Sequence, residues 1–146
     1  MSTFMDAAIE QARLAGQRGE VPIGSVITLN NEIIARAGNR TREETDPTAH
    51  AELLAIRQAT QLLGRERLAD CDLYVTLEPC AMCAAAISFS RIKRLYYGAT
   101  DSKSGGVESG IRFYSDPTCH HRPEIYSGLS ESECSELLTS FFERLR

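Results

Sequence analysis

The sequence has no long apolar run and no excess of basic residues. No stretch approaches the ~18 consecutive apolar residues of a membrane span, and Asp6 and Glu10 interrupt the N-terminal segment, which lacks a secretory apolar region. Sixteen Lys and Arg against 20 Asp and Glu give a formal net charge of -4, which argues against coating nucleic acid through whole-molecule charge. We therefore expect a cytoplasmic protein without membrane contact, in which any nucleic-acid binding uses a local basic patch.

Repeats, low-complexity tracts and linkers rich in Pro, Gly or Ser are also missing, so nothing marks a domain boundary. The 146 residues, 42% hydrophobic and 25% charged, suit a globular protein with a conventional core. The five cysteines are an odd number and no export signal is evident, which argues against a disulfide framework. We expect a single domain over residues 1–146.

Hydrophobic spacing and turn residues predict an α/β protein. Helices are expected over residues 3–16, 49–63 and 81–89 and in a last segment after residue 130. Strands are expected over residues 24–29, 32–37, 73–77, 95–99 and 124–126. Asn30 and Asn31 tolerate the positive φ angles of a tight hairpin turn between the first two strands. Alternation of strand and helix further along builds parallel sheet, so the fold expected is a three-layer α/β/α arrangement with a five-stranded mixed sheet.

The last helix carries its own local signals. Ser130 and Glu133 have the spacing of a capping box, and Leu129 can pack as a staple against Cys134. Its expected apolar face consists of Leu137, Leu138, Phe141, Phe142 and Leu145. We expect at least one of the two phenylalanines to lie in the core.

Two clusters of chemically active residues begin predicted helices, each after a turn that contains proline. His50 and Glu52 lie in the first, and Cys80 and Cys83 in the second. Residues at i and i+3 share a helix face, so one metal ion can bind both sulfurs. His50 and Glu52 point about 200° from one another around a helix, so a common target must lie off its N-terminal end. We expect the two helix starts to converge.

One imidazole and two thiolates form a zinc-binding set that leaves the fourth tetrahedral position for water. Zinc can lower the pKa of that water to about 7, and the partial positive charge of a helix N-terminus favours thiolate and hydroxide. We therefore predict zinc ligands at His50, Cys80 and Cys83. Glu52 is best used as a proton shuttle to the substrate nitrogen and leaving group, and should not bind the metal.

Other interpretations of these residues stay open. Cys80 and Cys83 could form a thiol redox pair or be two buried small residues. Glu52 alone could be a solvated helix carboxylate. A structural zinc site would need a fourth protein ligand, for which the Cys and His candidates are Cys71, Cys119, Cys134, His120 and His121.

His-x-Glu combined with Pro-Cys-x-x-Cys is the signature of zinc nucleobase deaminases. Across residues 21–24, 38–40, 46–52, 73–80 and 90–92, and over nearly the whole chain, the sequence resembles the bacterial tRNA-specific adenosine deaminases. The resemblance implies the cytidine-deaminase fold and the hydrolytic conversion of adenosine to inosine at the wobble position of a tRNA anticodon, chiefly in arginine tRNA. It also implies a homodimer with one zinc ion per subunit.

The resemblance assigns zinc binding and proton transfer to the same four residues and adds substrate contacts. It implies that Asn39 recognises the base or ribose and that the Ala51 backbone helps to hold the base. Asp101, Ser102 and Lys103 resemble the family's loop that meets the nucleotides flanking the target. Without the resemblance, Asn39 would be taken for a turn residue and the second segment for a plain surface turn.

The implied partner is a tRNA anticodon stem-loop, which supplies the target base already partly unstacked, and no DNA binding is expected. Candidate phosphate contacts in the later half are Arg91, Lys93, Arg94, Lys103, Arg112, Arg122, Arg144 and Arg146. Candidate stacking aromatics are Tyr97, Phe113, Tyr114 and Phe142. His120 and Glu143 depart from the family pattern, in which asparagine and a basic residue are common, and both touch suspected RNA contacts.

Two rival functions use the same residues. A deaminase of free bases or nucleosides, acting on guanine or cytosine compounds, would have the same metal set in a closed small pocket. A non-catalytic zinc domain would bind RNA or protein without turnover.

Overall fold

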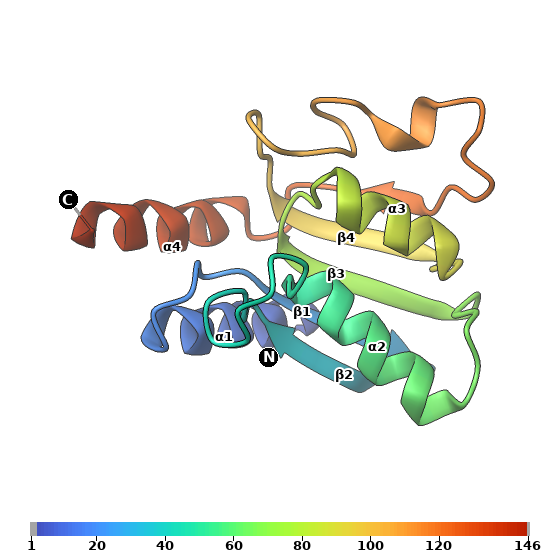
Figure 1. Ribbon diagram of the computed structural model, residues 1–146, viewed down its shortest axis with the longest axis horizontal. Coiled ribbons are helices and arrows are strands. Elements are labelled where there is room, and N and C mark those ends of the chain that lie inside the picture. Colours follow the sequence, from blue (N-terminus) through green and yellow to red (C-terminus); the bar gives the residue numbers. More distant parts are fainter. Residues whose placement is uncertain (1–2, 146) are drawn as a thin grey trace.

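A computed structural model describes residues 3–145 and shows one mixed sheet of five strands in the order β2-β1-β3-β4-β5 (Figure 1). Strand β1 (Gly24–Leu29) pairs antiparallel with β2 (Glu32–Gly38) and with β3 (Cys71–Leu77). Strands β4 (Arg94–Ala99) and β5 (Glu124–Tyr126) continue the sheet in parallel. The mixed sheet predicted from the sequence is confirmed.

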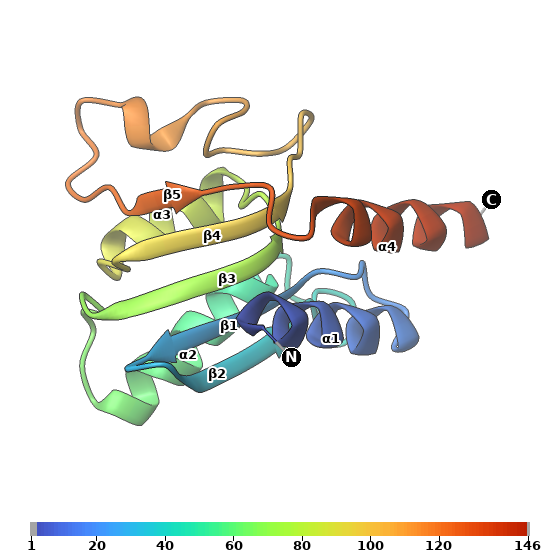
Figure 2. The same cartoon turned by 180° about the vertical axis from the view of Figure 1, so that it is seen from behind.

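Helices lie on both faces of the sheet, which gives the predicted three layers. Helices α2 (Ala51–Leu63) and α3 (Ala81–Phe89) cover the face turned to the viewer in Figure 1. Helices α1 (Phe4–Gln17) and α4 (Glu131–Arg144) belong to the opposite side, and α4 extends beyond the end of the sheet (Figure 2). A short 3-10 helix spans Phe113–Ser115, between β4 and β5.

Sequence patterns place most element boundaries within two residues. Asn30 and Asn31 adopt φ angles of 51° and 63°, as the predicted hairpin turn requires. The second helix begins at Ala51, two residues later than expected, because His50 is still extended at φ -79° and ψ 151°. Strand β3 begins at Cys71, earlier than expected, because its antiparallel pairing with β1 continues to Leu29.

The main core fills the space between the sheet and helices α2 and α3. Leu73 and Leu95 on the strands and Ile87 on α3 have no exposed surface. Ala55 and Ala59 are also fully buried, and their small side chains let α2 approach the sheet closely. Because each fully buried large aliphatic side chain contributes about 1.5–3 kcal/mol, this layer holds the starts of α2 and α3 in fixed positions relative to the sheet.

The capping box predicted at the start of α4 is wrong. Ser130 has a left-handed backbone at φ 53°, and its side chain makes no capping hydrogen bond. Glu133 instead accepts a hydrogen bond from Arg13 of α1 at 2.8 Å. Leu129 and Cys134 do pack in one buried cluster, as the predicted staple requires.

The apolar face of α4 is only partly covered. Phe141 is buried, which confirms that one of the two phenylalanines lies in the core, whereas Phe142 is 45% and Leu145 64% exposed. Within residues 3–145, no helix is both long and apolar enough to cross a membrane.

Candidate metal centre

Three donor atoms meet where helices α2 and α3 begin. His50 is the N-cap residue of α2 and Cys80 that of α3, and Cys83 follows in the first turn of α3. The His50 Nδ1 atom lies 3.7 Å from the Cys80 Sγ atom and 3.5 Å from the Cys83 Sγ atom. All three donor atoms lie within 4.8 Å of one another. The predicted convergence of the two helix starts is confirmed.

The spacing of these atoms fits a tetrahedral zinc ion. Zinc bonds of about 2.3 Å to sulfur and about 2.0 Å to nitrogen place two such ligands about 3.5 Å apart at the tetrahedral angle. The observed N to S distances of 3.5 and 3.7 Å agree with that value. His50, Cys80 and Cys83 therefore form the zinc site.

The structure does not support the alternative of a four-ligand structural zinc site. Among residues 3–145, the only group of three or more His, Cys, Asp and Glu residues with metal-binding spacing is this one. The five candidate fourth ligands, Cys71, Cys119, Cys134, His120 and His121, are outside it. All five cysteines are free thiols, so Cys80 and Cys83 form no disulfide here.

The pKa values of the two cysteine thiols shift in opposite directions. A hydrogen bond with Cys83, followed by one with His50, lowers the pKa of Cys80 to about 4 against the opposing effect of burial. The same hydrogen bond to Cys80, together with burial, raises the pKa of Cys83. Since metal-bound cysteines are thiolates, occupation of the site must release the proton that Cys83 retains.

Glu52 lies in the first turn of α2 and is 4% exposed, so it is not a solvated helix carboxylate. Burial raises the pKa of Glu52 to about 7, against the opposing effects of a backbone hydrogen bond and the His50 charge. It lies outside the group of three metal donors. A carboxyl group with a pKa near neutrality beside a metal centre is suited to accept and return a proton.

Asn39 follows strand β2 and contacts Ala51, the first residue of α2 and the neighbour of the metal ligand His50. It is 6% exposed, and its Oδ1 atom accepts a hydrogen bond from the Ala51 N–H at 2.9 Å. Because this oxygen is the acceptor for Ala51, the other polar group of the side chain, the amide NH2, can act as a donor to a ligand. This burial and contact distinguish Asn39 from an ordinary turn residue.

Two residues that sequence analysis missed fix this arrangement. Ser25 on β1 donates a hydrogen bond to the Ala51 carbonyl at 2.8 Å, and Arg18 donates to the Asn39 carbonyl at 3.1 Å. Ser25 is fully buried in an otherwise apolar strand. A polar residue in such a strand is the signal that could have identified it.

Asp101 and Lys103 lie on a loop beside the second cluster. The Asp101 Oδ1 atom accepts hydrogen bonds from the N–H groups of Lys103 at 3.1 Å and Ser104 at 3.0 Å, which fixes the turn. Gly105 pairs with Cys80 in an isolated β-bridge. Lys103 is exposed. The loop therefore lies next to the metal ligand Cys80 and exposes Lys103 to solvent.

Some basic candidates for RNA contact are engaged within the chain. Arg94 forms ion pairs with Asp72 at 3.5 Å and Glu124 at 3.8 Å. The Arg122 guanidinium donates to three backbone carbonyls, those of Tyr114, Asp116 and Cys119. These contacts give both arginines structural roles.

The remaining candidates divide by exposure. Tyr97 and Tyr114 are buried, which excludes them as stacking platforms. The exposed positions are Lys93, Lys103, Arg112, His120, Phe142, Glu143 and Arg144. Arg146 lies outside the described residues.

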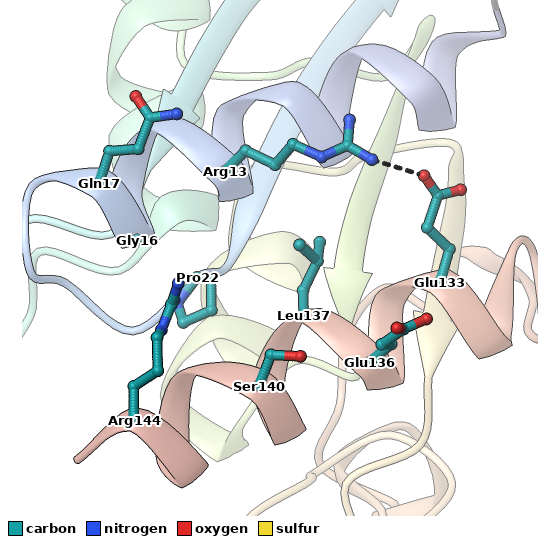
Figure 3. Close-up of a pocket in the computed structure, with 9 residues that line it drawn as sticks. All are labelled: Arg13, Gly16, Gln17, Pro22, Glu133, Glu136, Leu137, Ser140 and Arg144. Atoms are coloured by element: carbon teal, nitrogen blue, oxygen red, sulfur yellow. Dashed lines mark hydrogen bonds and ion pairs between the residues drawn. The ribbon is translucent and has the colours of Figure 1, made fainter.

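A separate groove between α1 and α4 contains none of the metal-site residues (Figure 3). The ion pair of Arg13 with Glu133 at 2.8 Å spans the two helices, and Glu136 and Arg144 add further charge of both signs. Pro22 and Leu137 also line it, but the groove lacks the predominantly apolar lining typical of small-molecule sites.

Comparison with known proteins agrees with this geometry. Residues 1–99 match the family model of the cytidine and deoxycytidylate deaminase zinc-binding region. The chain is 64% identical over 143 residues to the tRNA-specific adenosine deaminase of Agrobacterium fabrum, which covers 98% of this chain and 94% of that protein.

Two solved structures are also similar. One, from studies of A-to-I editing by tRNA:A34 deaminases at the wobble position, is 65% identical with a TM-score of 0.91, covering 92% of this chain and 98% of that one. The guanine deaminase of Bacillus subtilis is 32% identical with a TM-score of 0.68, covering 96% of this chain and 94% of that one.

Proposed function

This chain belongs to the tRNA-specific adenosine deaminases, and from that membership we propose that it converts the wobble adenosine of a tRNA anticodon to inosine, with arginine tRNA as its chief substrate. The observation that carries the proposal is the three-donor zinc site with a buried carboxyl beside it. This combination supplies the two functions that hydrolytic deamination needs, an activated water and a proton carrier.

The reaction adds water to C6 of adenine and expels ammonia. His50, Cys80 and Cys83 would hold the zinc ion, which would supply the lowered pKa of a bound water and so a nucleophile near neutral pH. Glu52 would accept the two protons of this water in turn, giving the first to the ring nitrogen N1 and the second to the departing amino group. A C–O bond forms, a C–N bond breaks, and Glu52 ends in its starting protonation state.

Asn39 and Ala51 would hold the base while this occurs. The Asn39 amide nitrogen can donate to an acceptor on the purine edge, because its Oδ1 atom is already bonded to the Ala51 N–H. The Ala51 carbonyl accepts from Ser25.

Several partner and location assignments complete the proposal. Asp101 and Lys103 would meet nucleotides beside the target in an anticodon stem-loop, and the exposed Lys103 offers a cation to phosphate. We further propose a homodimer with one zinc ion per subunit, acting in the cytoplasm where tRNA is found.

The experiment that tests the function compares substrates. Purified protein is incubated separately with tRNA, guanine and cytidine, and products are identified by nucleoside analysis and ammonia release. We expect inosine at the wobble position of arginine tRNA and no ammonia from the two small compounds.

The similarity to a guanine deaminase makes free-base deamination the second candidate. Ammonia released from guanine alone would establish that candidate and contradict the proposal. Turnover with none of the three substrates, in protein containing a full complement of zinc, would instead indicate a non-catalytic zinc domain.

A further inference from the structure

The metal site is joined to the 101–109 loop by a buried carboxylate that the reaction itself does not use. Glu78 is 2% exposed and lies at the end of β3, directly before Pro79 and Cys80. A buried carboxylate needs several hydrogen bonds to offset the loss of its hydration. All five of the hydrogen bonds that Glu78 accepts come from this loop.

The two oxygens of Glu78 together bind both ends of the loop. The Oε1 atom accepts from the Asp101 N–H at 3.0 Å and from the Ser109 hydroxyl at 2.9 Å. The Oε2 atom accepts from the N–H groups of Val107, Glu108 and Ser109 at 3.1, 2.9 and 2.8 Å. One side chain thus closes the loop on itself.

The loop also packs closely against the turn that precedes α3. The Gly106 N–H donates to the Pro79 carbonyl at 2.8 Å, and Gly105 pairs with Cys80. A Cβ atom on Gly105 would lie 2.5 Å from the Glu78 Cδ atom, and one on Gly106 would lie 2.7 Å from the Ala81 nitrogen. Glycine is therefore required at both positions for this close approach.

We propose that Glu78 is a positioning residue, which fixes the 101–109 loop against the cysteine-bearing turn and so presents Lys103 to RNA in one geometry. The role of Lys103 rests on the proposed function, whereas the loop contacts of Glu78 do not. Glu78 contributes to catalysis through the loop and touches neither the substrate nor the metal.

Glu78→Gln is the informative substitution, because it keeps the size of the side chain and replaces one oxygen by a donor. With its remaining oxygen at the Oε2 position, glutamine keeps three backbone hydrogen bonds and places an NH2 group against the Asp101 N–H. We expect amide hydrogen exchange, followed by NMR on the zinc-loaded protein, to accelerate at least 10-fold at Asp101 and much less at 107–109.

Glu20→Gln provides a matched control. Glu20 is a 1% exposed carboxylate that accepts hydrogen bonds from the N–H groups of Arg42 and Glu43, in a different loop. Its substitution should accelerate exchange at residues 42 and 43 and leave the 101–109 amides unchanged. An equal acceleration of the 101–109 amides in both variants would mean general loosening and would overturn the proposal.

A double-mutant cycle with Lys103→Ala tests the link to RNA. We expect Lys103→Ala to raise KM for an anticodon stem-loop several-fold in the wild-type background and by less than half that factor in the Glu78→Gln background. The factor should be unchanged in the Glu20→Gln background. Equal factors in all three backgrounds would overturn the coupling.

Measuring the zinc content of the Glu78→Gln variant distinguishes a role of Glu78 in positioning the loop from a role in holding the metal. Glu78→Gln should retain one zinc ion per chain, and loss of zinc would show that Glu78 acts on the Cys80 turn, which would overturn the proposal. If wild-type protein forms no inosine, the proposed function fails by that result alone, and the exchange measurements still decide whether Glu78 holds the loop.

Discussion

At the scale of single residues, burial determines what Glu52 can do. The side chain is 4% exposed and lies beside three metal donors without belonging to them. Burial raises the pKa of Glu52 to about 7, so both protonation states are accessible near neutral pH. A group with these properties is suited to gain and lose protons during turnover, the role that we propose for Glu52, and it is outside the set of metal donors.

Glu52→Ala should therefore abolish turnover and spare zinc binding. General acid-base catalysis contributes about 10²–10⁴-fold, so we expect kcat to fall by at least about 100-fold. Zinc content by elemental analysis and the circular dichroism spectrum should match those of the wild type. Glu131→Ala, which changes an acidic first-turn residue of α4, is the control. Retained turnover in the Glu52→Ala variant would remove the role assigned to this residue.

Asn39 offers a second test at this scale. Asn39→Asp keeps an oxygen for the Ala51 N–H and removes the amide donor, whereas Asn39→Ala removes both. A lost hydrogen bond that leaves a buried group unpaired costs about 1–3 kcal/mol, so kcat/KM should fall about 5- to 150-fold for Asn39→Asp. The control is Asn30→Asp in the exposed hairpin turn. Unchanged steady-state kinetics for Asn39→Asp would contradict base recognition by the amide.

Sequence patterns identified the residues whose roles follow from local spacing. His50, Cys80 and Cys83 could be assigned because each lies at the cap or in the first turn of a helix that follows a proline turn. Ser25 and Glu78 could not, because their partners at Ala51 and in the 101–109 loop are distant along the chain. Only the folded sheet brings those partners together.

At the scale of elements, the approach of α1 to β1 depends on one missing side chain. A Cβ atom on Gly24 would lie 2.1 Å from the Ala8 carbonyl oxygen and 2.4 Å from the Ala12 nitrogen, both on the backbone of α1. Neither atom can move without shifting the helix. Gly24 therefore sets the distance between α1 and the sheet.

Gly24→Ala should destabilise the protein by about 1–3 kcal/mol or more, the usual cost of overpacking, measured by denaturant unfolding. Gly16 lies inside α1, where a Cβ atom would meet the Pro22 Cβ atom at an ordinary 3.4 Å. Gly16→Ala should therefore gain up to about 1 kcal/mol from helix propensity. Equal stability of Gly24→Ala and wild type would show that α1 shifts without cost.

Element boundaries were predictable where local signals decide them. The Thr3 capping box with Asp6 begins α1 close to the expected residue. Helix α4 begins at Glu131, as expected, but without the predicted capping box, and Glu133 pairs with Arg13 of α1, a contact that no pattern within α4 encodes.

At the scale of the whole molecule, the core and the zinc site are separable. Leu73, Ile87 and Leu95 are buried without any contribution from the metal, so the chain should stay folded when zinc is removed. Because zinc binds the folded state and not the unfolded state, it still raises the free energy of unfolding, by about 2.7 kcal/mol when free zinc is 100 times the Kd.

Chelation should therefore lower the Tm without removing the helical circular dichroism signal, and added zinc should restore the Tm. Because the pKa of Cys83 is raised and only its thiolate binds zinc, zinc affinity should fall as pH is lowered. Complete unfolding on chelation, or an unchanged Tm in protein shown to have lost its zinc, would contradict this separation.

X-ray absorption spectroscopy of the zinc-loaded protein tests the three-ligand site most directly. We predict one zinc ion per chain with two sulfur neighbours, one imidazole nitrogen and one light atom that exchanges with solvent. Four protein donors around the ion, or protein purified without chelators that holds no zinc, would contradict a catalytic centre at His50, Cys80 and Cys83.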